Sequence, residues 1–415
     1  MPTMAELCAG GGLLTRALEE TFGVTSKWHA ESDPAASKVL ERRWPGVPNF
    51  GDVTRIAWST IGLVDLLAAG FPCQPFSSSG KRGGSTDERH LWPTGVLPGI
   101  EALMPPVLVL ENVPNLLRIE RGEVFGVILA DLDRLGYTVA WTVVGACKMG
   151  ACHHRHRLFM LAVRSPGVSV PSQEPTAERA GDVWLPVQRV LFGDVQAVRW
   201  PASGVSRAGV MWPLPVETCG EGGILLPTPR TSDTNGAGAH GDGGLDLRTV
   251  VSMLPTPRAS DTGTPGRRAS EGFRPPLSQV ILPMFPTPTA RDAGRGAGRP
   301  FAEGRPLSEV VALVPPGQFG KYEPAVRRQE VAFGLTVPAP TEPGRAGKPR
   351  LAAAFPEWMM AAPRGFLTDV VSRNEALRIA GNGVFGPVVG HALSSLPTFG
   401  PAVALLSRQH LGVAA

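Results

Sequence analysis

The sequence predicts an α/β fold in which a mostly parallel sheet carries helices on both faces, together with a second, smaller and irregular domain. Between residues 3 and about 164, short apolar stretches such as "PTMAELCAG" and "PPVLVLENV" alternate with helical patterns such as "LLTRALEETFG". Alternation at that spacing is typical of parallel strands linked by helices. From about residue 166 to 345 the chain becomes rich in Pro, Gly, Thr and Arg and has few periodic segments. This change indicates a separate domain.

The domain boundaries follow from the length and from a further change in composition. The chain has 415 residues, which exceeds one average domain. Helical periodicity returns near Leu351 and continues through "NEALRIAGNGVFGPVVGHALSSL". We therefore expect a first domain at residues 1–165, a second at 166–345, a helical segment at 346–398 and a tail at 399–415.

The composition suits a globular protein with much irregular backbone, because 43% of residues are hydrophobic, 18% are charged, and Gly (50) and Pro (42) are abundant. No apolar run reaches the roughly 18 residues of a membrane span, and the N-terminal residues lack the pattern of a signal peptide. We therefore expect a cytoplasmic protein with no membrane partner. The cysteines are odd in number and scattered, so free thiols are expected. They are Cys8, Cys73, Cys147, Cys152 and Cys219.

A run of glycines marks a candidate ligand site. Gly10 to Gly12 lie between an expected strand and an expected helix, where the backbone can approach a ligand at a helix N-terminus. Glu31 lies 21 residues after Gly10, at the end of the next expected strand, where an acid can accept hydrogen bonds from ribose hydroxyls. Asp52 and the apolar Val53 suit an adenine ring. These residues predict a nucleoside-type cofactor; a purely structural turn or a nicotinamide cofactor are the alternatives.

Five motifs then follow one another along the chain. They are "LCAGGG" near Gly10, "GFPCQPFS" around Cys73, "ENV" at Glu111 to Val113, "HHRHRLF" from His153, and "GNGV" at Gly381 to Val384. In this order they resemble the DNA (cytosine-5) methyltransferases of bacteria and phages, and "DERHLW" near Asp87 resembles the segment between the second and third motifs. The resemblance covers about residues 1–164 and 351–395.

The resemblance implies a Rossmann-like, S-adenosylmethionine-dependent methyltransferase domain that the segment at 346–398 completes. The segment at 166–345 would be the target-recognition domain. S-adenosylmethionine is then the cofactor and S-adenosylhomocysteine the product, with no metal. Double-stranded DNA is the expected partner of a monomeric protein, in restriction-modification beside a cognate restriction endonuclease or in phage DNA protection.

The resemblance also assigns catalytic roles. Cytosine C5 is a poor nucleophile, so a thiolate must first add to C6, and this role goes to Cys73. Glu111 protonates N3. Arg155 and Arg157, two residues apart on an expected strand, point the same way, hold the cytosine O2 and orient Glu111. The cytosine must be flipped out of the duplex to be reached. The stretch "SSSGKRGG" after Cys73 suits a loop that closes over it.

The remaining site residues are implied by their places in the same motifs. The cofactor-binding set is Leu7, Cys8, Gly10, Gly11, Gly12, Glu31, Asp52, Val53, Pro72, Leu91, Asn382 and Val384. The substrate-binding set is Gln74, Ser77, Lys81, Arg82 and Asn112.

Several positions depart from the family's usual motifs. Glu6 and Cys8 stand where Asp and Phe are usual, and Leu13 stands where a last glycine would fall. His153 replaces a usual Gln, and Cys152 a common Pro. None of these departures removes an acid, a base or a nucleophile.

The expected recognition domain contains an internal repeat of about 30 residues, within about 226–315. "PTPRTSD", "PTPRASD" and "PTPTARD" begin at Pro227, Pro255 and Pro286, and each is followed by a short apolar run. Between residues 258 and 305, eight Arg and four acids give 8 − 4 = +4. This charge suits a phosphate-rich partner, and a duplicated, solvated linker is the alternative.

Other functions remain open. "CKMGACHHRH" contains possible zinc ligands, although their spacing matches no usual structural zinc site. These ligands are Cys147, Cys152, His153, His154 and His156. A family member that methylates RNA cytosine, or a catalytically inactive DNA-binding relative, would share the motifs. A nicotinamide dehydrogenase would share only the glycine turn, because nothing in "PCQ" or "ENV" serves hydride transfer.

Overall fold

The computed structural model describes the chain at residues 1–72, 91–165, 167–181, 183–187, 198–216, 247, 319, 322–343 and 349–410. Its strands are β1 (Thr3–Leu7), β2 (Thr25–Ala30), β3 (Leu66–Ala69), β4 (Val107–Asn112), β5 (Thr138–Gly145), β6 (His156–Val163), β7 (Ala177–Ala180), β8 (Val183–Pro186), β9 (Ser203–Arg207), β10 (Val210–Pro213), β11 (Thr341–Pro343) and β12 (Pro349–Leu351). Its helices are α1 (Leu13–Phe22), α2 (Pro34–Arg43), α3 (Leu97–Leu103), α4 (Glu123–Arg134), α8 (Glu323–Phe333), α9 (Ala354–Met359), α10 (Arg373–Asn382), α11 (Gly386–Ser394) and α12 (Phe399–His410).

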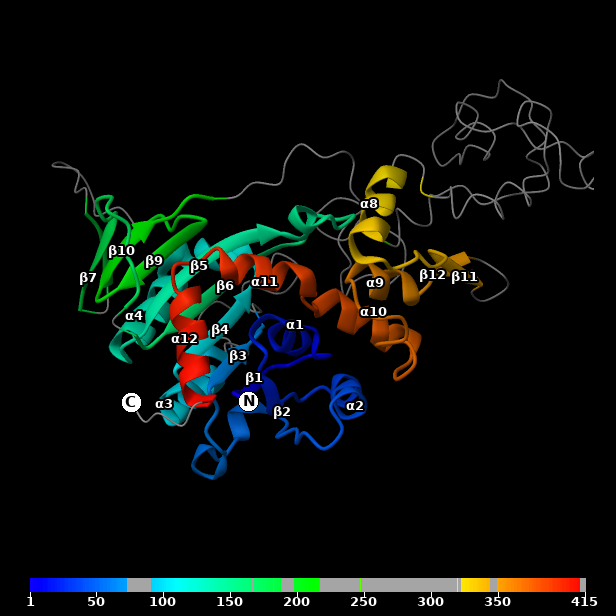
Figure 1. Ribbon diagram of the computed structural model, residues 1–415, viewed down its shortest axis with the longest axis horizontal. Helices are drawn as coiled ribbons and strands as arrows, with labels where there is room; N and C mark the ends of the chain where they lie inside the picture. The colour runs from blue at the N-terminus through cyan, green and yellow to red at the C-terminus, as the bar shows by residue number, and fades with distance from the viewer. Residues whose placement is uncertain are drawn as a thin grey trace, which may run out of the picture.

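One large sheet organises the described part of the molecule (Figure 1), in the strand order β2-β1-β3-β4-β6-β5-β9-β10-β7-β8. Strands β1 to β4 pair in parallel. From β4 onward the pairs are antiparallel. The predicted α/β fold is confirmed, and its parallel part is the β2-β1-β3-β4 half. The other half is a series of antiparallel strands.

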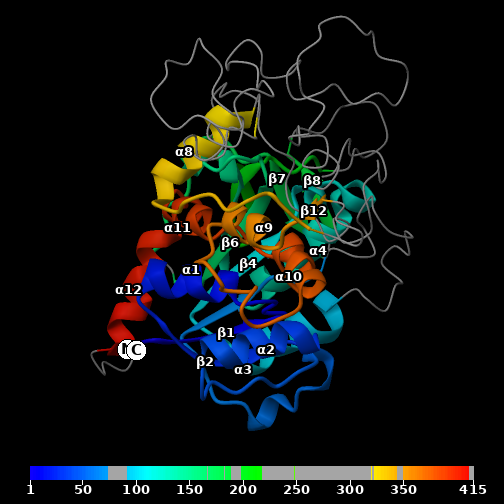
Figure 2. The same ribbon diagram turned by 90° about the vertical axis from the view of Figure 1, so that its right-hand side faces the viewer.

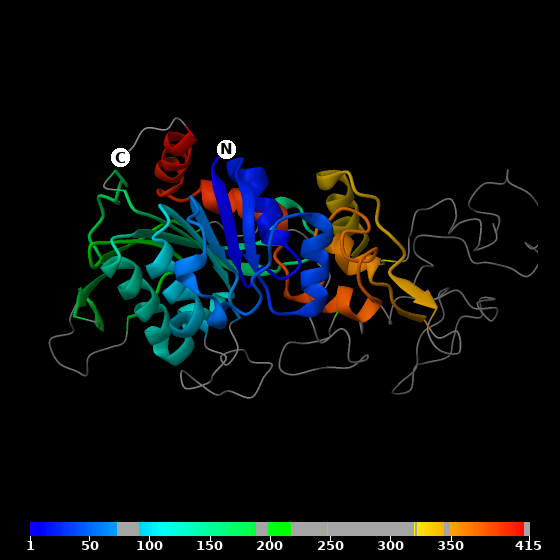
Figure 3. The same ribbon diagram turned by 90° about the horizontal axis from the view of Figure 1, so that it is seen from below.

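Helices cover both faces of the sheet because successive residues of each central strand point to opposite sides. In β3, Leu66 and Ala68 join one hydrophobic core, whereas Leu67 and Ala69 join the other. The first core is covered by α1, α11 and α12, and the second by α3 and α4. Figure 3 shows the red C-terminal helices on one side of the sheet and the blue-green helices α3 and α4 on the other. The parallel strands β1, β3 and β4 are therefore buried on both faces, as parallel sheets require.

The return of the chain to the first domain is visible in the packing of α11. This helix lies against α1, β5 and β6. In Figure 1, helices α8, α9 and α10 lie on the side of the described structure away from β7–β10, and Figure 2, seen from that side, shows α9 and α10 toward the viewer. Helix α10 begins with a capping box, in which Ser372 and Glu375 each satisfy the other's backbone N–H. The segment that leads into "GNGV" is thus a defined helix, and its last residues line the cavity described below.

Two of the expected domain divisions differ from the packing of the described elements, and the domain boundaries themselves stay predictions. Strands β7–β10, between residues 177 and 213, extend the main sheet, so the boundary expected at 165/166 lies inside the first structural unit. The expected tail at 399–415 contains α12, in which Ala402 and Leu406 are buried against the core. The expected repeats within about 226–315 lie almost entirely outside the described residues.

Within the described residues, no helix taken singly is long and apolar enough to cross a membrane. One bent pair, Arg373–Ser394 with Phe399–Arg408, passes that test by length and composition only.

Candidate cofactor and catalytic site

A cavity of about 430 Å³ opens at the carboxyl ends of β1 to β4. The chain leaves β1 toward β2 on one side, and β3 lies on the other side, so the cavity lies where ligands bind in open α/β sheets. Its wall is made from segments that are far apart in the sequence. They include residues 8–11, 31–33, 51–53, 70–72, 111–113 and 381–384.

The glycine run divides into an open position and two packed positions. Gly10 has a φ of +54°, and a side chain there would meet no atom within 4 Å, so its backbone faces free space. A methyl group on Gly11 would lie 2.6 Å from Ile379 of α10, and one on Gly12 would lie 2.4 Å from the ring of Trp44. Of the three, Gly10 is therefore open to a ligand. Gly11 and Gly12 allow close packing within the protein.

Glu31 is held by the backbone beside Gly10. Its Oε2 accepts a hydrogen bond from the Gly10 N–H at 2.7 Å, and its Oε1 accepts one from the Asp33 N–H at 2.7 Å. Burial raises the pKa of Glu31 above its usual value. The carboxylate is fixed at the rim of the cavity with its remaining lone pairs available, as the prediction of ribose binding requires.

Asp52 and Val53 form the next part of the wall. Asp52 caps the 3-10 turn η1 (Val53–Arg55) by accepting hydrogen bonds from the N–H and the hydroxyl of Thr54. These bonds hold the pKa of Asp52 below its usual value. Val53 is buried, and its side chain fits against Gly95, where a methyl group would lie 2.6 Å away. An anionic and an apolar side chain thus lie together on the cavity wall.

Glu111, at the end of β4, is the acid at the opposite side of the cavity. Arg157 donates from Nε to its Oε1 at 2.8 Å, and its Oε2 lies 3.6 Å from where a side chain on Gly70 would begin. Burial raises the pKa of Glu111 above its usual value, although Arg157 and Arg155 act in the opposite direction. A carboxyl group that is oriented by an arginine and has a raised pKa can hold a proton for donation.

Asn112, expected to bind substrate, has a positioning role in the structure. Its side chain is buried; Nδ2 donates to the carbonyl of Phe71 at 3.1 Å, and Oδ1 accepts from the N–H of Val113 at 2.9 Å. The amide therefore ties the end of β4 to the segment that leads into Pro72. Contact of Asn112 with substrate stays a prediction.

Arg155 differs from the expectation that both arginines point the same way on a strand. Strand β6 begins at His156, and Arg155 has a φ of +31° before it. Its buried guanidinium donates to the carbonyls of Gly381, at 3.0 Å, and Gly383. Arg155 does not line the cavity. It fixes the "GNGV" segment, whereas Arg157 fixes the acid.

His153 continues this pattern. It is fully buried, and its Nε2 bonds the carbonyl of Met359 at 2.8 Å, while its ring meets Phe385 edge-on. Burial lowers the pKa of His153 to about 3, so the ring is neutral and Nε2 carries the proton that it donates. Alternate residues of "HHRHR" therefore hold α9, the "GNGV" segment and the acid in turn.

The zinc alternative finds no support among the residues that the structure describes. No group of three or more His, Cys, Asp and Glu there is placed to hold a metal ion. Cys152 has a buried free thiol, and its backbone N–H donates to Oε1 of Gln329. The rings of His154 and His156 stack on each other, with their centroids 5.8 Å apart. Cys147 is disulfide-bonded, so the expectation of free thiols throughout is wrong at that residue.

The other expected site residues fall into three groups. Those on the cavity wall, besides the residues already placed, are Cys8, Pro72, Leu91, Asn382 and Val384. Two of the expected residues do not line the cavity: Leu7, which is fully buried, and Gly12. Those outside the described residues are Cys73, Gln74, Ser77, Lys81 and Arg82.

Three titratable residues of the wall were not expected from the sequence: Glu6, Asp33 and Arg378. "SDP" at residues 32–34 is a helix-start signal that could have singled out Asp33 as a cap. For Arg378 no local signal exists, because its partner lies 345 residues away.

Sequence comparison adds an independent finding. Residues 2–184 match the family described as C-5 cytosine-specific DNA methylase. Over 138 residues the chain is 38% identical to the type II methyltransferase M.NgoBV of Neisseria gonorrhoeae. The aligned stretch covers 32% of this chain and 33% of that protein. Over 159 residues it is 36% identical to the type II methyltransferase M.BsuFI of Bacillus subtilis, which covers 38% of each. The chain spans between a third and a half of the length of the curated relatives that it matches.

A solved structure of the S. pombe Dnmt2 methyltransferase aligns with 95% of this chain and 98% of its own at a TM-score of 0.45 and 14% identity. The family match at residues 2–184 includes the cavity segments 8–11, 31–33, 70–72 and 111–113 but not 381–384. Over residues 2–184, the chain is therefore similar to the C-5 cytosine-specific DNA methylases.

Proposed function

We propose that the protein is an S-adenosylmethionine-dependent DNA (cytosine-5) methyltransferase that modifies a specific double-stranded sequence, in a type II restriction-modification system or in phage DNA protection. The observation that carries the proposal is the Glu111–Arg157 pair, an oriented acid that faces the cavity. The relatives named type II methyltransferases support the assignment of substrate and system.

The cavity residues fit S-adenosylmethionine. The open backbone at Gly10 admits a ligand at the N-terminal end of α1, and Glu31 offers oxygens to ribose hydroxyls. Asp52 beside Val53 suits an adenine amino group and ring, and Asn382 lies at the far side of the cavity. When bound there, the cofactor supplies an electrophilic methyl group.

The protein's own residues would carry out the remaining chemistry. The thiolate of Cys73 adds to C6 of the flipped cytosine while Glu111 donates a proton to N3, which makes C5 nucleophilic. After C5 has taken the methyl group, its proton leaves to water and the C6–S bond breaks, which restores the thiolate. N3 then returns its proton to Glu111, so the acid is ready for the next cycle. Arg157 keeps Glu111 aimed at the base throughout.

A direct test is to express the chain in a bacterium that lacks cytosine methylation and to sequence its DNA for 5-methylcytosine. We expect methylation at one recurring sequence with the wild type and none with Cys73→Ala. The control is retained binding of S-adenosylhomocysteine by Cys73→Ala, which shows that the variant is folded. Methylation that persists in Cys73→Ala would contradict the proposed nucleophile, and methylated RNA without methylated DNA would contradict the proposed substrate.

A second test captures the bond that the mechanism requires. DNA that carries 5-fluorocytosine at the target cannot lose a proton from C5, so the thiolate cannot be expelled after methyl transfer. We expect a covalent protein–DNA complex, resistant to denaturant, that forms only when S-adenosylmethionine and Cys73 are both present. A complex of equal yield with Cys73→Ala would contradict the adduct.

A further inference from the structure

We propose that Arg378 positions the cofactor, although it carries out no chemistry, through a two-point ion pair with Asp33 that joins the two walls of the cavity. We call this pair the Asp33–Arg378 clasp. The inference deepens the proposed function, because it takes S-adenosylmethionine as the ligand of the cavity.

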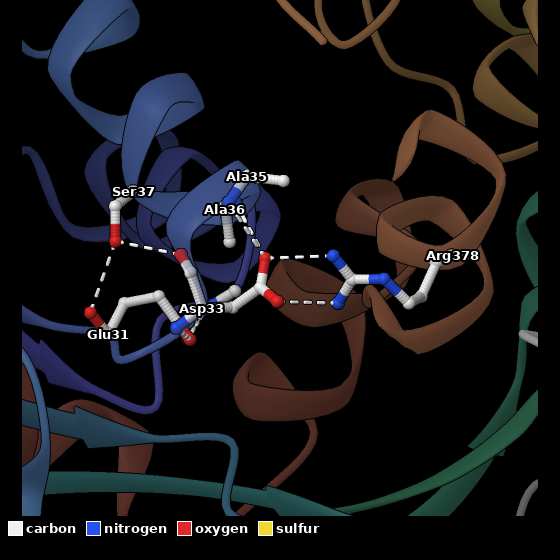
Figure 4. Close-up of polar contacts among 7 residues, drawn as sticks. Glu31, Asp33, Ala35, Ala36, Ser37 and Arg378 are labelled. Carbon is white, nitrogen blue, oxygen red and sulfur yellow. Dashed lines mark hydrogen bonds and ion pairs between the residues drawn. The ribbon is translucent and has the colours of Figure 1, made fainter. Parts of the chain in front are cut away.

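The clasp has the geometry of a paired, charge-assisted hydrogen bond (Figure 4). Arg378 lies in α10, and its Nη1 is 2.7 Å from Oδ2 of Asp33, while its Nη2 donates to Oδ1 at 3.0 Å. The residues are 345 positions apart in the chain, and both line the cavity. Two parallel bonds fix direction as well as distance, which a single ammonium contact does not.

On one side, the clasp continues into the residues that would hold the ribose. Asp33 caps α2 by accepting hydrogen bonds from the N–H groups of Ala35 and Ala36, at 3.1 and 2.8 Å. Its own N–H donates to Glu31, and Glu31 in turn accepts from Gly10. A continuous chain of bonds thus runs from Arg378 through Asp33 and Glu31 to the open glycine.

On the other side, the clasp fixes the end of α10. Arg378 lies one helical turn before Asn382, and Arg155 donates to the carbonyls of Gly381 and Gly383. The segment that would face the methionine end of the cofactor is therefore held by two arginines. Removal of the clasp releases one of these two restraints and lets the walls separate.

The charge environment is consistent with a persistent pair. Partial burial alone would raise the pKa of Asp33. The hydrogen bonds from Arg378 and from the α2 backbone outweigh this effect and keep the pKa of Asp33 below its usual value. The side chains are 34% and 28% exposed, so salt reaches the pair and weakens it. Cofactor affinity should therefore fall as ionic strength rises, and it should fall less in a variant without the clasp.

The experiment measures binding of S-adenosylhomocysteine to the full chain by titration calorimetry. Arg378→Gln removes the charge and keeps most of the stem. Asp33→Asn removes the charge but keeps an amide oxygen for the helix cap. The matched control is Arg16→Gln, which makes the same change in the exposed Arg16–Glu20 pair of α1, away from the cavity.

We expect Arg378→Gln and Asp33→Asn each to weaken binding about tenfold. We expect the double variant to lose no more than either single variant, because both break the same contact. Arg378→Lys should recover part of the affinity. In turnover, KM for S-adenosylmethionine should rise while kcat and KM for DNA stay unchanged, a separation that general loss of structure would not produce.

The outcomes separate the two proposals. Wild-type protein that binds cofactor, together with an Arg378→Gln variant of unchanged affinity, would overturn the clasp alone. Losses that add in the double variant, or a rise in both KM values with a fall in kcat, would also overturn it. Wild-type protein that binds no S-adenosylmethionine or S-adenosylhomocysteine would overturn the proposed function and the clasp with it.

Discussion

Glu6 is a buried acid at the floor of the cavity, and its replacement by Gln should remove a pH dependence of stability. It lies in β1, is 1% exposed, and accepts a hydrogen bond from the hydroxyl of Thr15. Burial raises its pKa to about 8, against the hydrogen bonds from Thr15, and the carboxylates of Glu31 and Glu111 add to the rise. The folded protein therefore keeps Glu6 protonated at neutral pH.

The sign of the effect follows from the difference in pKa between the two states. A Glu in the unfolded chain has a pKa near 4.3, so between that pH and about 8 the folded state holds one proton more than the unfolded state. The free energy of unfolding then falls by about 1.4 kcal/mol for each unit of rising pH. Between pH 5 and 7.5 the loss from this one group is on the order of 3 kcal/mol. Glu6→Gln cannot ionise, and its carbonyl oxygen can still accept from Thr15.

The assay is urea unfolding of wild type and Glu6→Gln at pH 5, 6, 7 and 7.5. We expect the variant to gain stability relative to wild type as the pH rises, by about 3 kcal/mol across this range. The matched control is Glu20→Gln, whose side chain is 63% exposed in α1 and whose effect should stay within about 1 kcal/mol at every pH. A difference between wild type and Glu6→Gln that is the same at pH 5 and 7.5 would refute the reasoning.

Three further predictions concern the site. Arg157→Gln should lower kcat by about a hundredfold and move the alkaline limb of the pH–rate profile to higher pH, because the arginine holds down the pKa of Glu111; an unmoved limb would contradict the pairing. Asn112→Ala should cost about 1–3 kcal/mol in urea unfolding by leaving the Phe71 carbonyl unsatisfied, and it should reduce methylation while cofactor binding persists. Gly12→Ala should destabilise the fold by at least about 1–2 kcal/mol, because an added methyl group meets an indole ring at a φ of +76°; thermal unfolding at the wild-type temperature would contradict this.

The parts of the site that could be predicted depend on contacts that are local in sequence. Gly10 and Glu31 each follow a parallel strand, and the carboxyl ends of parallel strands meet at one edge of the sheet. The position of a residue along its own strand therefore sufficed to bring these two together, whereas Asp52 comes from the N-cap of a 3-10 turn. Glu111 follows the same rule at the end of β4.

The parts that could not be predicted depend on backbone direction or on distant contacts. Alternation along a strand would place Arg155 and Arg157 on one face, but β6 begins one residue after Arg155, and the left-handed backbone there turns its side chain toward the return segment. Strands β7–β10 have only four or five residues each, too few to show a clear alternation, and only the pairing of β9 with β5 joins them to the sheet. The Arg378 contact depends on the folded arrangement of two segments that no local pattern connects.

The use of residues 378–384 as one wall of the cavity has a consequence for synthesis of the protein. Strands β1 to β4 and the glycine turn leave the ribosome early, but the cavity lacks this wall until the far end of the chain has emerged and α11 has docked against α1. Ligand binding can then stabilise only a polypeptide that includes residues 378–384, by mass action on the folded state. A nascent or truncated chain that ends before these residues would have neither a complete binding site nor that stabilisation, so cellular proteolysis would remove it in preference to a chain that contains them.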